Sequence, residues 1–161
     1  MKVYIRNRQR SIKVNQQRII RYIRKALKLL GLTKAELSIL FVNDCRMKVL
    51  NRDYRGIDKT TEVLSFPQYL PPFKSPLAKV GYRRVVNSAL RIPHSELLLG
   101  DIVINLHKAK RQAVEQGITL NEEVKRLIVH GLLHLLGYDH EKNRYQKRKM
   151  ELKEKELYDA C

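Results

Sequence analysis

Apolar and polar positions along the chain follow two spacings, one typical of β-strands and the other of α-helices. Residues 2–6 alternate between apolar and polar side chains, and residues 37–42 form an apolar run that suits a central strand. Strand patterns return over residues 61–66 and 97–105. Helical spacing of apolar residues occupies the segments that begin near Asn15, Asn43, Leu106, Thr119 and Glu141. This order predicts an α/β (α+β) fold, a single domain with a mixed, roughly four-stranded sheet and about five helices.

Capping residues mark where two of these helices begin. Asn43 follows the second strand and can cap the helix after it. Thr119 and Glu122 have the spacing of a capping box, in which each side chain satisfies a backbone N–H at the helix start. We therefore expect Thr119 to open a helix that continues through residues 130–135.

The length of the chain favours one domain over residues 1–161, large enough to bury a core of its own. No segment approaches the ~20 consecutive apolar residues that a membrane span needs. The first six residues alternate like a strand and lack the apolar centre of a signal peptide. Cys45 and Cys161 form no Cys-x-x-Cys or disulfide pattern, so we expect a reducing, cytoplasmic location.

Residues 67–98 interrupt the regular pattern and are expected to form a basic, proline-rich loop or insertion. All five prolines of the chain lie in this segment. Tyr69, Phe73 and Tyr82 stand among its basic residues, a combination that suits single-stranded bases and phosphates. A solvated insertion without a binding role accounts for the same composition equally well.

The chain carries a large excess of positive charge. The formal net charge is +17, from 33 basic and 16 acidic residues, which indicates a polyanionic partner. Nucleic acid is the first candidate and an anionic membrane surface the second, and composition does not separate RNA from DNA. The first 34 residues hold eleven lysines and arginines and no acid. The helix that begins near Asn15 should carry a positive stripe formed by Arg18, Arg21, Arg24, Lys25 and Lys28.

The main candidate for chemistry is a group of three histidines. His130 and His134 are four residues apart, so both imidazoles can reach one point beside a helix. Gly137 can end that helix with a positive φ and turn the chain back, which can bring His140 to the same point. Three neutral imidazoles can bind one Zn²⁺ and leave the fourth tetrahedral position for water. We therefore predict an open metal site at the end of this helix.

The spacing of the three histidines also matches the metzincin metallopeptidases. Those enzymes carry a glutamate, the general base, directly after the first histidine. Here that position is Gly131. The metal geometry is present without the peptidase's base, which weighs against peptide hydrolysis.

Several motifs together resemble the YbeY family of bacterial endoribonucleases. The segment His-Gly-Leu-Leu-His-Leu-Leu-Gly-Tyr-Asp-His at 130–140 matches that family's signature. Residues 61–67 and 99–104 resemble its second and third motifs, and residues 51–55 its Asn-x-x-Tyr-Arg segment. Two features depart from the family pattern: Glu62 replaces the usual aspartate, and the segment between the second and third motifs is longer and more basic.

The resemblance implies a zinc-dependent endoribonuclease specific for single-stranded RNA. It implies a role in ribosomal RNA processing, at the 3′ end of small-subunit rRNA, and in ribosome maturation, with RNA and the small subunit as partners. It makes His130, His134 and His140 the metal ligands and Arg55 a residue of RNA binding or catalysis. The nucleophile is either a metal-activated water or the substrate's own 2′-hydroxyl, and the residues favour neither.

Two other functions fit part of the pattern. One is a non-catalytic RNA-binding factor of ribosome assembly with a structural zinc, and the other is a metallopeptidase-like hydrolase. Among acidic residues, Asp139 is a candidate for orienting a ligand histidine. Asp101 and Glu62 are weaker candidates.

Overall fold

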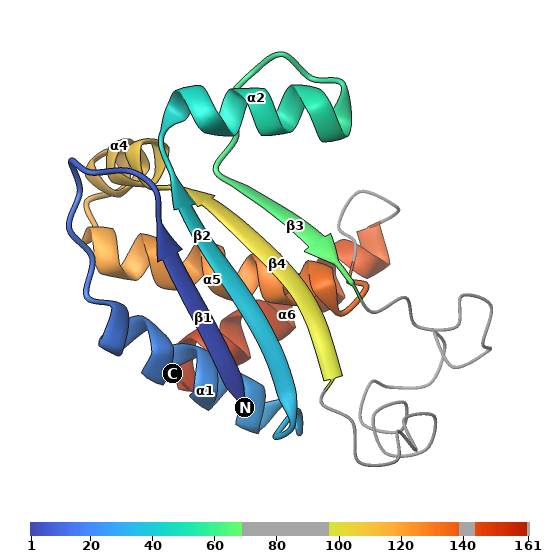
Figure 1. Cartoon of the computed structure of the whole chain (residues 1–161). Helices are drawn as coiled ribbons and strands as arrows, with labels where there is room; N and C mark the ends of the chain where they lie inside the picture. The colour runs from blue at the N-terminus through green and yellow to red at the C-terminus, as the bar shows by residue number, and fades with distance from the viewer. Residues whose placement is uncertain (69–96, 139–143, 161) are drawn as a thin grey trace.

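The computed structural model describes residues 1–68, 97–138 and 144–160. These ranges contain four strands and five helices, in agreement with the predicted fold class (Figure 1). In chain order the elements are β1 (Lys2–Asn7), α1 (Gln16–Leu29), β2 (Ala35–Val42), α2 (Asp44–Arg55), β3 (Val63–Pro67), β4 (Leu97–Asn105), α4 (Leu106–Gln116), α5 (Leu120–Leu135) and α6 (Arg144–Ala160).

The strands form one mixed sheet in the order β1-β2-β4-β3. β1, β2 and β4 are parallel, whereas β3 is antiparallel to β4. Ile39 in β2 lies opposite Ile5 in β1 and Ile102 in β4, so one row of apolar side chains crosses the sheet. This row belongs to the face that packs against the main hydrophobic core, which is the physical reason for the alternation in β1.

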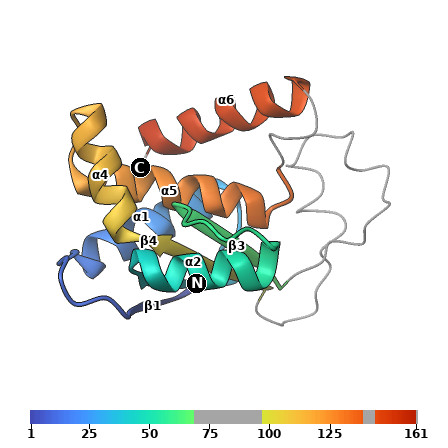
Figure 2. The same ribbon diagram turned by 90° about the horizontal axis from the view of Figure 1, so that it is seen from above.

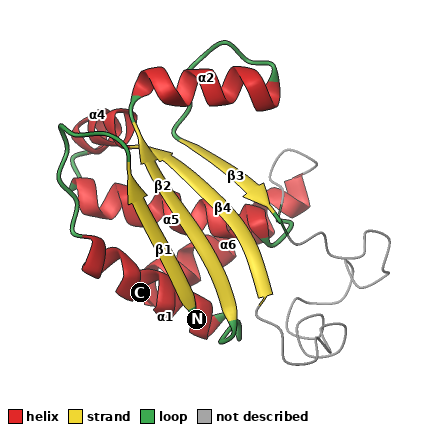
Figure 3. Ribbon diagram, in the orientation of Figure 1, coloured by secondary structure: helices red, strands yellow, loops and turns green. Residues whose placement is uncertain are grey.

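Helices cover both faces of the sheet (Figures 2 and 3). α1, α5 and α6 pack with one face in the main hydrophobic core, in which Phe41 and Leu132 are completely buried. α2 packs on the other face, where Met47 joins a smaller core with Leu64 and Val103. α5 therefore lies between the sheet and α6, and this position makes it the most buried helix. No helix within the described ranges is both long enough and apolar enough to cross a membrane.

Both predicted caps are confirmed. The Asn43 side chain accepts a hydrogen bond from the backbone N–H of Arg46 at the start of α2. Thr119 and Glu122 form the complete capping box at the start of α5. These contacts satisfy backbone donors that have no partner inside the helix.

β3 and β4 extend into the ends of the predicted loop. Pro67 belongs to β3, and Leu97 and Leu98 belong to β4. The Gln68 N–H donates to the Leu99 carbonyl at 3.1 Å, which continues the pairing of the two strands. The remaining residues of the segment, 69–96, and the aromatic residues predicted to bind bases there, lie outside the described residues.

Candidate metal centre

His130 and His134 lie together on α5, as the four-residue spacing predicts. Their Nε2 atoms are 3.0 Å apart, and their ring centroids are 4.7 Å apart in an edge-to-face arrangement. The His130 side chain is 23% exposed, so the pair stands at the boundary between the core and solvent. Both rings therefore direct the same nitrogen to one accessible point beside the helix.

The geometry of this pair fits a bound metal ion. Two imidazole nitrogens that bind one tetrahedral Zn²⁺ at ~2.05 Å are about 3.3 Å apart, close to the distance between the two Nε2 atoms. The third predicted ligand, His140, lies outside the described residues. Within the described ranges no three His, Cys, Asp or Glu side chains form a metal-binding group. The described part of the chain thus contains two of the three predicted ligands.

Glu154 of α6 supports one of these rings. Its Oε1 lies 3.1 Å from Nδ1 of His130, and its side chain is 21% exposed. In the tautomer with its proton on Nδ1, His130 donates that N–H to the carboxylate and keeps the lone pair of Nε2 for a metal. Such a carboxylate fixes both the tautomer and the orientation of a ligand histidine.

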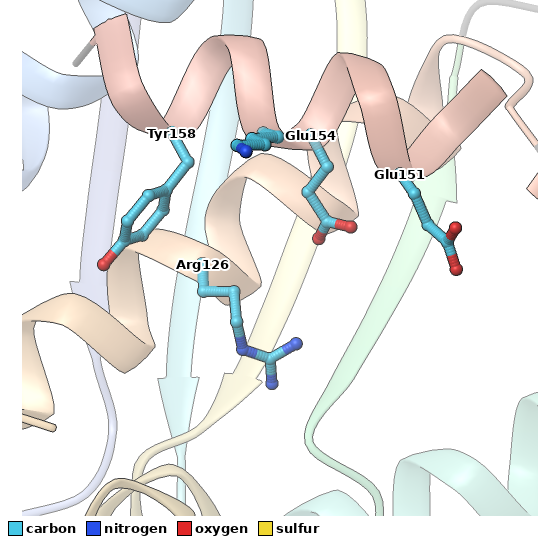
Figure 4. Close-up of a pocket in the computed structure, with 5 residues that line it drawn as sticks. Arg126, Glu151, Glu154 and Tyr158 are labelled. Carbon is cyan, nitrogen blue, oxygen red and sulfur yellow. The ribbon is translucent and has the colours of Figure 1, made fainter. Parts of the chain in front are cut away.

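Figure 4 places Glu154 between α5 and α6, with its carboxylate directed from α6 toward the α5 side. It lines a pocket with Arg126, Glu151, Lys155 and Tyr158. The sequence contains no signal that separates Glu154 from the neighbouring acids of α6. The contact with His130 joins residues 24 positions apart and arises from the packing of α6 on α5.

A glycine turn ends α5 directly after the histidine pair. Gly137 has φ 83°, its N–H donates to the His134 carbonyl at 2.9 Å, and the Tyr138 N–H donates to the Leu133 carbonyl at 3.0 Å. These two bonds form a Schellman motif, which reverses the chain at the helix end. The predicted role of Gly137 as a helix stop is confirmed.

Gly131 faces the sheet, not the point where the two histidines meet. A Cβ atom at this position would lie 2.9 Å from Cγ2 of Ile102 and 3.1 Å from Oγ of Ser65. The Ser65 hydroxyl also donates to the Gly131 carbonyl at 3.1 Å. A glutamate side chain has no room here, and this contact argues against a peptidase of the metzincin type.

Arg55 occupies the last turn of α2, where it is exposed. Its side chain forms no hydrogen bond or ion pair with any residue that the structure describes. The ring of the preceding Tyr54 contacts Phe66 of β3 edge-to-face, at a centroid distance of 4.9 Å. In both views the C-terminal ends of α2 and α5 lie toward the same side of the molecule, with β3 between them (Figures 1 and 2).

The acidic candidates have other partners. Glu62 contacts Lys108 and Gln112 of α4 at 3.0 and 2.7 Å. Burial alone would raise the pKa of the Glu62 carboxyl, but hydrogen bonds, chiefly from Lys108, outweigh it and hold that pKa below its usual value. Asp101 accepts a hydrogen bond from Gln68 at 2.8 Å. Asp139 lies outside the described residues.

The fold and the histidine pair together define an α/β domain with a candidate metal centre near the end of α5. The two Nε2 atoms meet at an accessible point, and a carboxylate backs one of the two rings.

The chain belongs to the endoribonuclease YbeY family, whose model matches residues 4–161. A relative of that name from Aquifex aeolicus (strain VF5) is 43% identical over 137 residues, which are 85% of this chain and 77% of the relative. One from Syntrophus aciditrophicus (strain SB) is 36% identical over 159 residues, 98% of this chain and 88% of the relative. The family resemblance of the sequence motifs is confirmed.

The comparison of structures supports the same fold. A solution structure of a Thermotoga maritima protein covers 98% of this chain and 87% of its own, with a TM-score of 0.60. The two sequences are 21% identical, so the likeness is evidence for the fold alone.

Proposed function

We propose that this protein is a zinc-dependent endoribonuclease that cleaves single-stranded RNA. The observation that carries the proposal is the histidine pair, in which two Nε2 atoms meet while Glu154 contacts the opposite nitrogen of His130. This arrangement lies on the signature motif of a family whose curated members are named endoribonucleases. RNA as the substrate also agrees with the net charge of +17.

His130, His134 and His140 would hold the zinc ion in this proposal. When bound, zinc supplies a Lewis acid that polarises a phosphoryl oxygen and activates water. Glu154 keeps the proton of His130 on Nδ1, so that Nε2 stays available as a ligand. Arg55 contributes a guanidinium that pairs with a backbone phosphate of the RNA near the cut.

The proposed cellular role follows from the family motifs. The substrate is ribosomal RNA at the 3′ end of the small-subunit rRNA, and the partner is the small ribosomal subunit in the cytoplasm. The exposed Arg55, with no ion-pair partner in the described part of the chain, is available to bind such a substrate.

The test is cleavage of a single-stranded RNA by purified protein, with and without a chelator and after zinc is restored. His134→Ala should abolish cleavage, whereas His107→Ala, a histidine on α4 outside the pair, should retain it. Zinc content of each variant is measured in parallel. Cleavage that persists in the chelator and in His134→Ala would contradict a zinc-dependent enzyme.

A second function is an RNA-binding ribosome-assembly factor with a structural zinc. The observation that favours it is the basic surface of α1, which lies apart from the histidine pair. This function predicts RNA binding that survives His134→Ala, together with no cleavage by the wild-type protein. The same experiment therefore separates the two functions.

A further inference from the structure

α1 has two faces of opposite character. One face is buried in the main core through Ile19, Ile23, Ala26 and Leu27. The other is exposed and carries four cations, Arg21, Arg24, Lys25 and Lys28, which we call the α1 basic face.

The four cations follow helical spacing on a single side. Steps of three, one and three residues place them within about 100° of the helix circumference, opposite the buried side chains. From Arg21 to Lys28 the helix rises about 10 Å. The α1 basic face is thus a narrow, continuous row of positive charge that points into solvent.

No carboxylate of the described residues pairs with this row. Residues 1–34 contain no acid, and none of the four cations forms an ion pair with a described residue. Arg18, one turn earlier, differs because its guanidinium donates to the Tyr22 hydroxyl and lies over that ring.

α6 provides an internal comparison. It is also rich in lysine and arginine, but acids are interleaved with them. Lys153 pairs with Glu156 at 2.8 Å, and Lys147 approaches Glu151 at 4.0 Å. α6 has the composition of a solvated helix face, whereas α1 contains no acid of its own to offset its cations.

This charge pattern destabilises α1 on its own. Like charges three or four residues apart on one helix repel each other and disfavour the helix. The first turn of α1 also lacks the acid that would complement the helix dipole. Helix stability therefore does not account for the row, whereas a polyanionic partner would relieve the repulsion.

The α1 basic face is separate from the histidine pair. α1 contacts the first part of α5, where Nζ of Lys125 lies 5.3 Å from the centre of the Tyr22 ring of α1. His134 follows nine residues later, about 13 Å further along α5. RNA held on the α1 basic face would therefore be bound away from the bond that is cut.

We propose that the α1 basic face is a docking surface for the sugar–phosphate backbone of RNA. Guanidinium and ammonium groups in a row match successive phosphates, and such contacts carry affinity without sequence preference. The proposal rests on the proposed function in naming RNA as the substrate, but docking itself requires no cleavage.

The test compares two triple variants of equal net charge. One is Arg21→Gln, Arg24→Gln and Lys28→Gln. Its matched control is Lys110→Gln, Lys147→Gln and Arg148→Gln, three exposed cations of α4 and α6. Glutamine is a good helix former, so both variants should fold, which far-UV circular dichroism checks.

Binding of a fluorescent single-stranded RNA is titrated over a series of salt concentrations. The α1 variant should bind at least ~10-fold more weakly, and its slope of log Kd against log salt should fall by about 2, or about 0.7 for each lost phosphate contact. The control should keep nearly the wild-type slope. In cleavage assays the α1 variant should raise KM and leave kcat unchanged.

Three outcomes would overturn the proposal. The first is an α1 variant that keeps the wild-type RNA affinity and salt slope. The second is an equal loss of RNA affinity in the α1 variant and the control. The third is an α1 variant that binds RNA like wild type but no longer binds phosphatidylserine vesicles. The last result would identify a membrane surface as the occupant. A wild-type protein that does not cleave RNA would contradict the proposed function. The docking proposal would still be tested in that case, because RNA binding is measured separately from cleavage.

Discussion

At the scale of single residues, the chemistry of the histidine pair depends on two neighbours that come from other elements. Glu154 of α6 contacts Nδ1 of His130, while Gly131 lets α5 approach β3 and β4 closely. Glu154 contacts His130 directly, and Gly131 is the residue that follows His130 in α5. Substitution of Glu154 tests the contact with the His130 ring, whereas substitution of Gly131 tests the packing of α5 on the sheet.

Glu154→Ala should weaken zinc binding by ~10–100-fold, because His130 then loses the acceptor that orients its ring. Glu154→Gln keeps an oxygen acceptor and should recover most of the affinity. The measurement is competition for zinc with a chromophoric chelator.

Glu151→Ala serves as the control for Glu154, since Glu151 lines the same pocket one turn earlier in α6. An equal loss of zinc affinity in both alanine variants would assign the effect to α6 packing instead of the contact with His130.

Gly131→Ala should lower the free energy of unfolding by about 1–2 kcal/mol, although alanine favours helices intrinsically. The new Cβ would lie 2.9 Å from a methyl group of Ile102, whose branched side chain in β4 has little freedom to move. Urea unfolding measures the change. A variant more stable than wild type would mean that α5 can move away from the sheet without penalty.

At the scale of elements, a polar network ties the starts of α2 and α4 together. The completely buried Asn105 caps α4 with its oxygen and donates to Asp44 and Thr60 through its Nδ2 atom. Arg111 of α4 forms two bonds of 2.8 Å with the Asp44 carboxylate. The hydrogen bonds from Arg111 are the main cause that lowers the pKa of Asp44, to about 2. Burial alone would raise this pKa, and the hydrogen bond from Asn105 helps to lower it.

Asp44→Asn should therefore lower the free energy of unfolding at neutral pH. The charged carboxylate is favoured in the folded state, so its contribution is present above the usual pKa of 3.8 and is lost as the pH falls through about 2. About a third of the side chain is exposed, and after allowance for solvent screening the loss should be about 1 kcal/mol or less.

Urea unfolding at neutral pH and near pH 2 measures the contribution of Asp44, with Asp58→Asn, a surface carboxylate paired to Lys48, as the control. A difference between wild type and Asp44→Asn that grows on acidification would reverse the expected sign.

At the scale of the whole molecule, the excess of positive charge opposes compaction. A net charge of +17 on 161 residues repels itself in the folded state more than in the expanded chain. The repulsion is concentrated on α1, which has no acid, whereas α6 forms ion pairs along its length. Salt screens exposed charges over about 10 Å or less at physiological ionic strength.

Sodium chloride should accordingly raise the free energy of unfolding of the wild-type protein. The α1 triple glutamine variant should be more stable than wild type at low salt, by up to about 1 kcal/mol, because several like-charge pairs are removed. The two should converge at high salt. Urea unfolding at two salt concentrations measures this, and wild-type protein that loses stability in salt would contradict it.

The sequence determined those features that depend on neighbours within one or two helical turns. Strand alternation, the caps Asn43 and Thr119, the common direction of His130 and His134, and the Gly137 turn are all set by local backbone geometry. Such spacings repeat wherever a helix or strand forms, so they can be predicted without knowledge of the packing.

Which elements contact one another depends on packing between distant parts of the chain and could not be predicted from local patterns. The strand order β1-β2-β4-β3, the contact of Ser65 with Gly131 and the contact of Glu154 with His130 join segments from 24 to 66 residues apart. No local pattern distinguishes Glu154 from other acids of α6, because its partner is selected by how α6 packs across α5. The common direction of His130 and His134 could therefore be predicted from the sequence, whereas the contact of Glu154 with His130 depends on the tertiary fold.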